Sequence, residues 1–193
     1  MSGKILSELF IAQRIKEVNE LINQTEEIGK KYSMQNILSS PEIQTWSAAQ
    51  VLAHLNSYNR YYLEAIETSL NNSSNKGQAG YYTPGILGAY FTRLMLPSTE
   101  TQKSRKMKSP QDHIPPNKPD AEAEINEFIK GERNLLKQLE KSKEVNLMKT
   151  RVPVSLNRFI KLQLGDTFHF LIAHQQRHFV QIQTILKKIE LNK

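Results

Sequence analysis

Apolar residues recur every three or four positions along most of this chain of 193 residues, a spacing that is typical of amphipathic helices and fits strands poorly. The first such stretch covers residues 5–28, and its repeating positions are Ile5, Leu9, Ala12, Ile15, Val18, Leu21, Ile22 and Ile28. Gly29, followed by two lysines, is the expected end of this helix, because glycine readily adopts the left-handed conformation that closes helices.

A second helix is expected to begin at Ser47 and to run to about Leu70. Pro41 favours an extended chain before it, and Ser47 with Gln50 three residues later matches a capping box. Its apolar stripe consists of Val51, Leu52, Leu55, Tyr58, Tyr62 and Ile66. The polar run at 71–77 ends the pattern.

Two more long helices are expected in the second half of the chain. One begins at Asp120, whose carboxylate can cap it. Its buried face is predicted to hold Ala121, Ile125, Phe128, Ile129, Leu135, Leu136 and Leu139. The other runs from about Leu164 to Lys188, with Phe168, Leu171, Ile172, Phe179, Ile182, Ile185, Leu186 and Ile189 inward.

The connections between these helices are long. Residues 84–96 suit a short apolar helix with Pro84 in its first turn, and 145–161 suit an extended piece or a helical turn. Residues 97–119 contain five prolines and the basic cluster Lys103, Arg105, Lys106 and Lys108. Without convincing strand alternation, the pattern predicts an all-α chain: a single domain over 1–193, folded as a four-helix bundle with long crossover connections.

Composition narrows the possible chemistry. The chain is 38% hydrophobic and 23% charged, as ordinary soluble domains are, and it has no cysteine. Disulfides, zinc–thiolate sites, iron–sulfur clusters and thiol nucleophiles are therefore excluded. Lys and Arg total 26 against 19 for Asp and Glu, a net charge of +7 that favours anionic partners. No apolar run reaches the roughly 18 residues of a membrane span, so we expect a cytoplasmic protein without membrane association.

Three histidines carry the clearest chemical signal. His174 and His178 are four residues apart on the last helix, which places both rings on one face, the face that buries Leu171 and Ile185. His54 lies on the inward stripe of the second helix. A divalent metal ion would explain three inward imidazoles, whereas separate hydrogen bonds are the plainer alternative.

The other two histidines are not expected among the ligands. His169 points about 140° away from His174 around the helix. His113 lies in the proline-rich connection.

Two segments, WSAAQVLAHL at 46–55 and LIAHQQRHFVQI at 171–182, resemble signature segments of the DinB/YfiT-like superfamily, and KMKSP at 106–110 adds to the resemblance. The resemblance implies a four-helix bundle with an unusual helix order and a divalent metal on His54, His174 and His178, and imidazole ligands favour zinc or nickel as that metal. The family includes mycothiol-dependent maleylpyruvate isomerase and bacillithiol transferase, so a low-molecular-weight thiol is an implied cofactor.

Neutral imidazoles cancel none of the charge of a metal ion, which can therefore activate water for hydrolysis or a thiolate for transfer. Tyr58, Arg177 and Gln181 are the candidates for moving protons or orienting the ligand, although packing and solvation explain such residues equally simply. The sequence thus predicts a metal-dependent thiol S-transferase acting on a small electrophile. A metal-dependent hydrolase and a non-catalytic, stress-linked metal-binding protein are the alternatives.

The expected partner is a small-molecule substrate, of anionic character if the basic cluster at 103–108 attracts it toward the site. Nucleic acid is disfavoured because that cluster has no interleaved aromatic residues and no base-reading motif. A homodimer is compatible with a bundle of this size.

Overall fold

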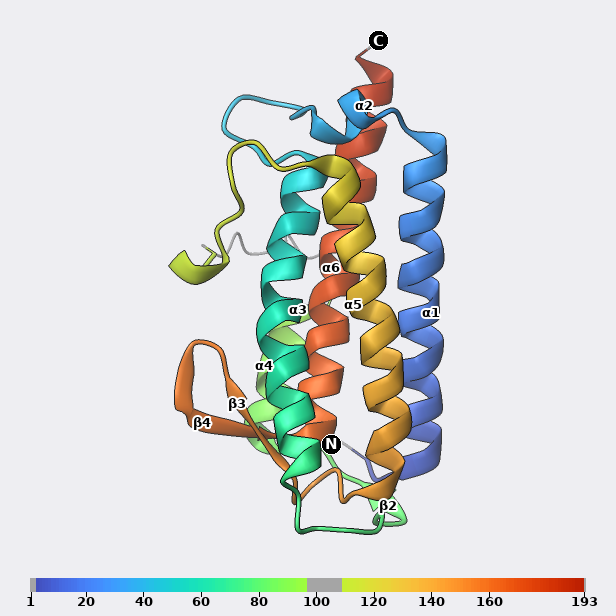
Figure 1. Ribbon diagram of the computed structural model, residues 1–193, viewed down its shortest axis with the longest axis vertical. Helices are drawn as coiled ribbons and strands as arrows, with labels where there is room; N and C mark the ends of the chain where they lie inside the picture. The colour runs from blue at the N-terminus through green and yellow to red at the C-terminus, as the bar shows by residue number, and fades with distance from the viewer. Residues whose placement is uncertain (1–2, 97–108, 193) are drawn as a thin grey trace.

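The computed structural model describes residues 3–96 and 109–192, and four long helices dominate it (Figure 1). These helices are α1 (Ser7–Lys31), α3 (Ala48–Asn71), α5 (Ala121–Lys141) and α6 (Leu164–Leu191). Both α5 and α6 pack against α1 and α3, so α1 and α3 lie diagonally across the bundle. The predicted four-helix bundle is confirmed.

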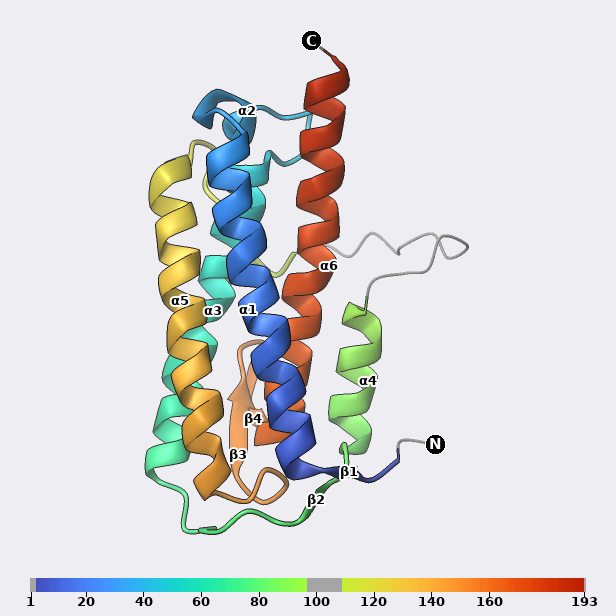
Figure 2. The same ribbon diagram turned by 90° about the vertical axis from the view of Figure 1, so that its right-hand side faces the viewer.

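The helix order explains the long connections. Helices α3 and α5 pack together and run in the same direction, so the chain must return along the bundle between them. Part of that return is α4 (Ile86–Met95), which packs outside the bundle against α6 (Figure 2). The short helix predicted at 84–96 is therefore present, but Gly85 is its N-cap, so Pro84 precedes the helix and does not lie in its first turn.

Local sequence signals set the starts of α3 and α5. Ser47 accepts a hydrogen bond from the Gln50 amide at 3.2 Å, and the Gln50 side chain accepts one from the Ser47 amide at 3.0 Å, which completes the predicted capping box. Asp120 caps α5 by accepting from two amides of its first turn at 3.1 Å.

The predicted stop at Gly29 is wrong. Helix α1 continues through Lys31. It ends at Tyr32, whose main-chain amide donates a hydrogen bond to the Ile28 carbonyl. The start of α1 also differs from the prediction, because Ile5 lies in a strand and Leu9 is 61% exposed while Phe10 and Ile11 are buried. The buried stripe of the first turns is therefore rotated by about one residue.

Two small antiparallel pairs correct the expectation of a chain without strands. Strand β3 (Arg151–Val154) pairs with β4 (Asn157–Gln163), so the extended alternative for 145–161 is the correct one. Strand β1 (Ile5–Leu6) pairs with β2 (Tyr81–Tyr82). Strands β1, β2 and β3 are too short for alternation to identify them, and Pro153 within β3 further obscures the pattern. The remaining short elements are α2 (Met34–Leu38), η1 (Gln111–His113) and η2 (Ser142–Glu144).

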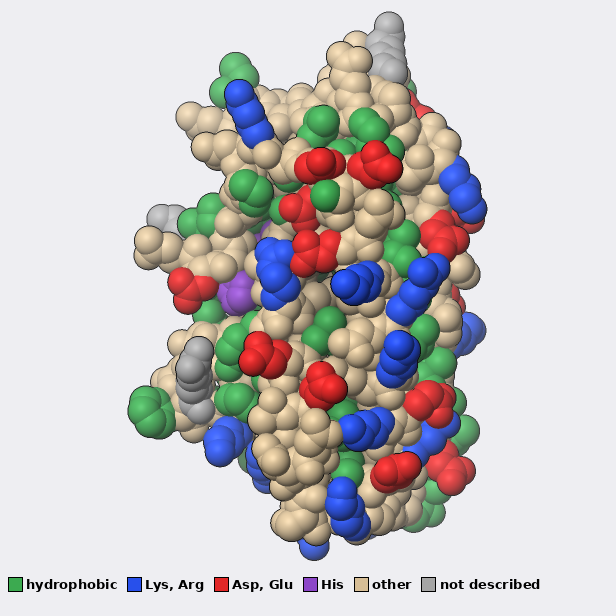
Figure 3. All heavy atoms as spheres, viewed as in Figure 1, with side chains coloured by type: hydrophobic (Ala, Val, Ile, Leu, Met, Phe, Trp, Pro, Cys, Tyr) green, Lys and Arg blue, Asp and Glu red, His purple; other side chains and the backbone are tan. Residues whose placement is uncertain are grey.

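The face formed by α1 and α5 carries interspersed charges of both signs (Figure 3). Arg133 on α5 reaches Glu26 on α1 at 3.5 Å, which illustrates this mixed character. The basic cluster at 103–108 lies outside the described residues. Within the described residues, no helix is long and apolar enough to cross a membrane.

Candidate metal centre

The three histidines predicted to bind metal come together inside the bundle. His54 lies on α3, and His174 and His178 lie one turn apart on α6, which packs against α3. One ring nitrogen from each lies within 4.8 Å of the other two. His54 and His174 are buried, and His178 is half-buried. The helical spacing and the packing of α3 on α6 thus place three imidazoles around one point.

The outer nitrogens of two rings have hydrogen-bond acceptors as partners. His54 Nδ1 lies 2.7 Å from the main-chain oxygen of His113, and His178 Nδ1 lies 2.8 Å from Gln181 Oε1. A carbonyl oxygen only accepts, so each Nδ1 must carry the proton and each Nε2 keeps its lone pair. Such outer hydrogen bonds are typical of metal-binding histidines, since they fix both the tautomer and the ring orientation.

His174 supplies the strongest sign that a cation belongs here. Its Nε2 lies 3.4 Å from His54 Nε2, and its Nδ1 is buried without a hydrogen-bond partner among the described residues. Two nitrogens that share a zinc ion at about 2.0–2.1 Å in tetrahedral geometry are about 3.4 Å apart. The donor set therefore fits a divalent metal, which would occupy the space between two nitrogens that otherwise make one long hydrogen bond at best.

The electrostatics of the cluster keep its rings neutral. Burial lowers the pKa of His54, and burial together with the neighbouring histidines lowers the pKa of His174 well below its usual value. Burial, reinforced by His54, lowers the pKa of His178 to about 4. Neutral imidazole is the form that coordinates metals, so the site does not have to lose a proton at neutral pH.

The structure places the three predicted catalytic candidates in different settings. Gln181 contacts His178 directly, as given above. Tyr58 is buried, with its ring centroid 4.4 Å from that of His174 and 5.1 Å from that of His54. Arg177 donates to the Leu94 carbonyl at 3.2 Å and so ties α6 to the end of α4. Gln181 and Tyr58 therefore adjoin the rings of the histidine cluster.

Sequence reasoning missed two neighbours of the site. His113 is buried, and besides its carbonyl contact with His54 its ring stacks on Tyr58 at 3.7 Å. Trp46, which directly precedes the N-cap Ser47 of α3, has its ring 5.2 Å from that of His54. No periodicity could have identified His113, because it lies in an irregular connection far from His54 in sequence.

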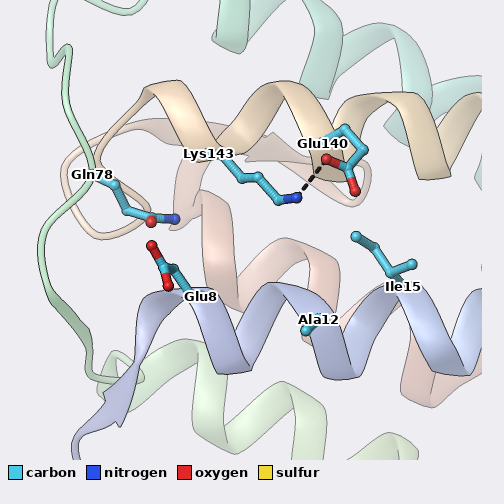
Figure 4. Close-up of a pocket in the computed structure, with 6 residues that line it drawn as sticks. All are labelled: Glu8, Ala12, Ile15, Gln78, Glu140 and Lys143. Atoms are coloured by element: carbon cyan, nitrogen blue, oxygen red, sulfur yellow. Dashed lines mark hydrogen bonds and ion pairs between the residues drawn. The ribbon is translucent and has the colours of Figure 1, made fainter.

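A separate surface hollow lies between the first turns of α1 and the end of α5 (Figure 4). It is lined by Glu8, Ala12, Ile15, Gln78, Glu140 and Lys143, and Lys143 forms an ion pair with Glu140 on the α5 side of the hollow. The hollow shares no residue with the histidine cluster, so we do not assign chemistry to it.

Comparisons with known proteins bear on this geometry. The model of the DinB superfamily matches residues 14–182, and a search of curated proteins gives no match. Among solved structures, the chain is similar to YfiT from Bacillus subtilis, with a TM-score of 0.56 and 11% identity over 93% of this chain and 87% of YfiT. YfiT is described as a probable metal-dependent hydrolase with an unusual four-helix bundle topology.

Proposed function

The chain belongs to the DinB superfamily, and on that premise we propose that it holds one divalent metal ion on His54, His174 and His178 and hydrolyses a small-molecule substrate there. The observation that carries the proposal is the convergence of three neutral imidazoles, two of them with their outer nitrogens fixed by acceptors. When bound, the ion supplies positive charge that lowers the pKa of a water molecule, the basis of hydrolysis, or of a thiol, the basis of thiol transfer.

The chain's own residues divide the remaining work. The carbonyl of His113 and the side chain of Gln181 hold two of the ligand rings in place. Burial, with Tyr62 nearby, raises the pKa of Tyr58 above its usual value, so its hydroxyl stays protonated and acts as a hydrogen-bond donor. Tyr58 is therefore the candidate for orienting a substrate oxygen beside His174.

The comparison with YfiT makes hydrolysis, and not thiol transfer, the first activity to test. YfiT, which has a similar fold, is described as a probable metal-dependent hydrolase. Three neutral ligands also suit an ion with coordination positions open to water. Thiol S-transfer to a small electrophile stays the second candidate, since the same uncancelled charge would favour a thiolate. Zinc or nickel as the metal, an anionic substrate, a cytoplasmic location and a homodimer stay predictions.

The test measures metal content and activity on the same preparations. Protein purified without a chelator or a polyhistidine tag is analysed for metal, beside His54→Ala and His174→Ala. We expect about one ion per wild-type chain, and a loss in both variants. His169→Ala is the matched control, because this histidine lies on α6 but outside the cluster.

The loaded protein is then assayed with small chromogenic esters, amides and phosphate esters, and separately with thiols and an electrophile. Metal-dependent turnover of the first group that requires His174 supports the hydrolase proposal. Turnover only in the presence of a thiol would replace it with the transferase. A wild-type chain that binds neither zinc nor nickel would refute the metal centre itself.

A further inference from the structure

Residues 109–116 contact one face of α3 at four successive points. Gln50 donates to the Pro116 carbonyl at 3.2 Å, and His54 bonds the His113 carbonyl at 2.7 Å. One turn further along α3, Ser57 and Tyr58 meet the ring of His113. Because these α3 positions follow helical spacing, the segment lies along the same face that presents His54.

The contacts between His54 and His113 are reciprocal. The ring nitrogen Nδ1 of His54 donates to the main-chain oxygen of His113. In return, His113 Nδ1 lies 2.9 Å from Ser57 Oγ, whose hydroxyl lies 2.7 Å from the main-chain oxygen of His54. A hydroxyl has one hydrogen, so with Ser57 donating to that oxygen, His113 Nδ1 must donate to Ser57. Each ring N–H thus leads to the other residue's carbonyl.

The ring of His113 is also held by packing. It is 5% exposed and stacks on Tyr58 with the centroids 3.7 Å apart and the planes inclined by 24°. The hydroxyl of Ser109 adds a second hydrogen bond to the His113 carbonyl, at 3.1 Å. The oxygen that faces His54 therefore belongs to a residue whose ring and backbone are both fixed.

From this arrangement we infer that His113 is a positioning residue of the metal centre. Its ring anchors the segment on Ser57 and Tyr58, and its carbonyl then holds His54 in the Nδ1–H tautomer with Nε2 directed at the metal. His113 itself is not a ligand. The inference rests on the metal centre proposed above and adds a residue that ligand spacing does not reveal.

His113 and Gln181 reach the same result by different routes. Gln181 orients His178 from three residues further along the same helix, so its position is guaranteed by α6. His113 orients His54 from a connection 59 residues away, so its carbonyl is in place only while its ring is anchored. Removing the His113 ring should therefore disturb His54 even though the carbonyl itself remains.

The direct test reads the tautomer of His54 in metal-free protein. Ring nitrogen shifts of nitrogen-15-labelled protein, recorded at pH about 8 and so above the ordinary imidazole pKa of roughly 6.5, distinguish a protonated Nδ1 from a protonated Nε2. We expect only the Nδ1–H form in the wild type. In His113→Ala and Ser57→Ala we expect a mixture of both forms.

The second readout is the affinity for Zn²⁺ alone, measured by competition with a chromophoric chelator. Loss of an outer hydrogen bond to a metal-binding histidine typically weakens the affinity about 10- to 100-fold, and we expect that range for His113→Ala. His113→Phe keeps the stack on Tyr58 but loses the N–H, so a smaller loss is expected. His169→Ala should change neither readout.

An Nε2–H tautomer in the wild type would overturn the inference. So would an unchanged tautomer and unchanged zinc affinity in the His113 and Ser57 variants. If His113→Ala does not fold, Ser57→Ala and His113→Phe decide the question by the same two readouts. A wild type that binds neither zinc nor nickel, but whose Nδ1–H form is lost in the variants, would refute the metal centre and the role of His113 in it, and would show only that His113 sets the tautomer of His54.

Discussion

Two groups of buried polar side chains lie on neighbouring turns of the bundle. They differ in how their polar atoms are satisfied away from water. The histidine cluster is His54, His174 and His178. The glutamate cluster is Asn59 on α3, Glu132 on α5 and Gln175 on α6, and Gln175 directly follows His174. A buried polar group without a partner is costly, so each cluster needs a means of satisfying its members.

The glutamate cluster is held by direct hydrogen bonds. Asn59 and Gln175 donate to Glu132 Oε1 at 2.9 Å and 2.6 Å, and Gln175 also donates to Asn59 at 3.0 Å. Gly131 permits this close approach of α5 to α3, because a Cβ at this position would lie only 3.0 Å from the side-chain nitrogen Nδ2 of Asn59. Within the described residues, the second oxygen of Glu132 and the oxygen of Gln175 are buried without a hydrogen-bond partner.

In the histidine cluster, by contrast, lone pairs of ring nitrogens face one another. A proton satisfies this arrangement poorly, whereas a metal cation satisfies it well. On the proposed function, these neighbouring buried polar sites would hold different positive species. The glutamate cluster is suited to a proton, and the histidine cluster is suited to a metal ion. The following experiments test that distinction.

The largest expected effect is the pH dependence that Glu132 gives to stability. Burial raises its pKa to about 8, from 4.5 in the unfolded chain. The native state then holds a proton that the unfolded chain has released. The stability from this group is therefore fully present below about pH 4.5, and it is lost as the pH rises through about 8, by at most about 1.4 kcal/mol per pH unit.

Glu132→Gln isolates this contribution, because a glutamine mimics the protonated acid and its NH₂ group could donate to the Gln175 oxygen. Denaturant unfolding of both proteins is compared across this pH range. We expect the wild type to lose stability relative to Glu132→Gln as the pH rises. Parallel curves would show that Glu132 is ionised in the native state.

A metal ion should stabilise the protein through the histidine cluster alone. Zn²⁺ at about 100 times its dissociation constant should raise the free energy of unfolding by about 2.7 kcal/mol. The gain should be the same in Glu132→Gln and absent in His178→Ala. An equal gain in His178→Ala would place the ion elsewhere. Denaturant unfolding with and without zinc, at one pH, measures all three.

Gln175→Ala should separate stability from metal binding. It removes donors from Glu132 and Asn59, both buried, and we expect a loss of about 2 kcal/mol in the free energy of unfolding. The zinc affinity should not change, because the Gln175 side chain bonds the glutamate cluster. A large loss of affinity would instead couple the two clusters.

The smallest expected effect is that of Gln181→Ala. Loss of its hydrogen bond to His178 should weaken zinc binding about 10-fold, which is about 1.4 kcal/mol, with little change in the stability of the metal-free protein. Gln183→Ala, at an exposed position on the same helix, is the matched control and should have no effect. Equal affinities in the two variants would remove Gln181 from the site.

The comparison also shows how far sequence reasoning reaches. The spacing of His174 and His178 and the inward stripe around His54 were enough to predict the three histidines that the structure brings together. Glu132 was not predicted, because one acidic residue on an amphipathic helix gives no signal that it faces inward. His113 is not expected among the ligands from its sequence position. Its contact with His54 cannot be inferred either, because it lies in an irregular connection.

Helix positions and helix starts could be predicted from the sequence, because they depend on residues close to one another along the chain. Helical periodicity placed the four long helices, the capping box fixed the start of α3, and Asp120 fixed the start of α5, since these interactions span only three or four residues. Where the local signal was weak, as at Gly29 and in the two short strand pairs, the prediction failed or missed the element.

The helices that pack together and the polar groups that contact one another could be seen only in the tertiary structure. The contacts of His54 with His113 and His174 join residues 59 and 120 positions apart, and Asn59 meets Glu132 across 73 positions. Such contacts depend on the packing of α3 between α5 and α6 and on the path of the crossover. Local patterns do not encode these, because packing depends on the shapes of several helices together.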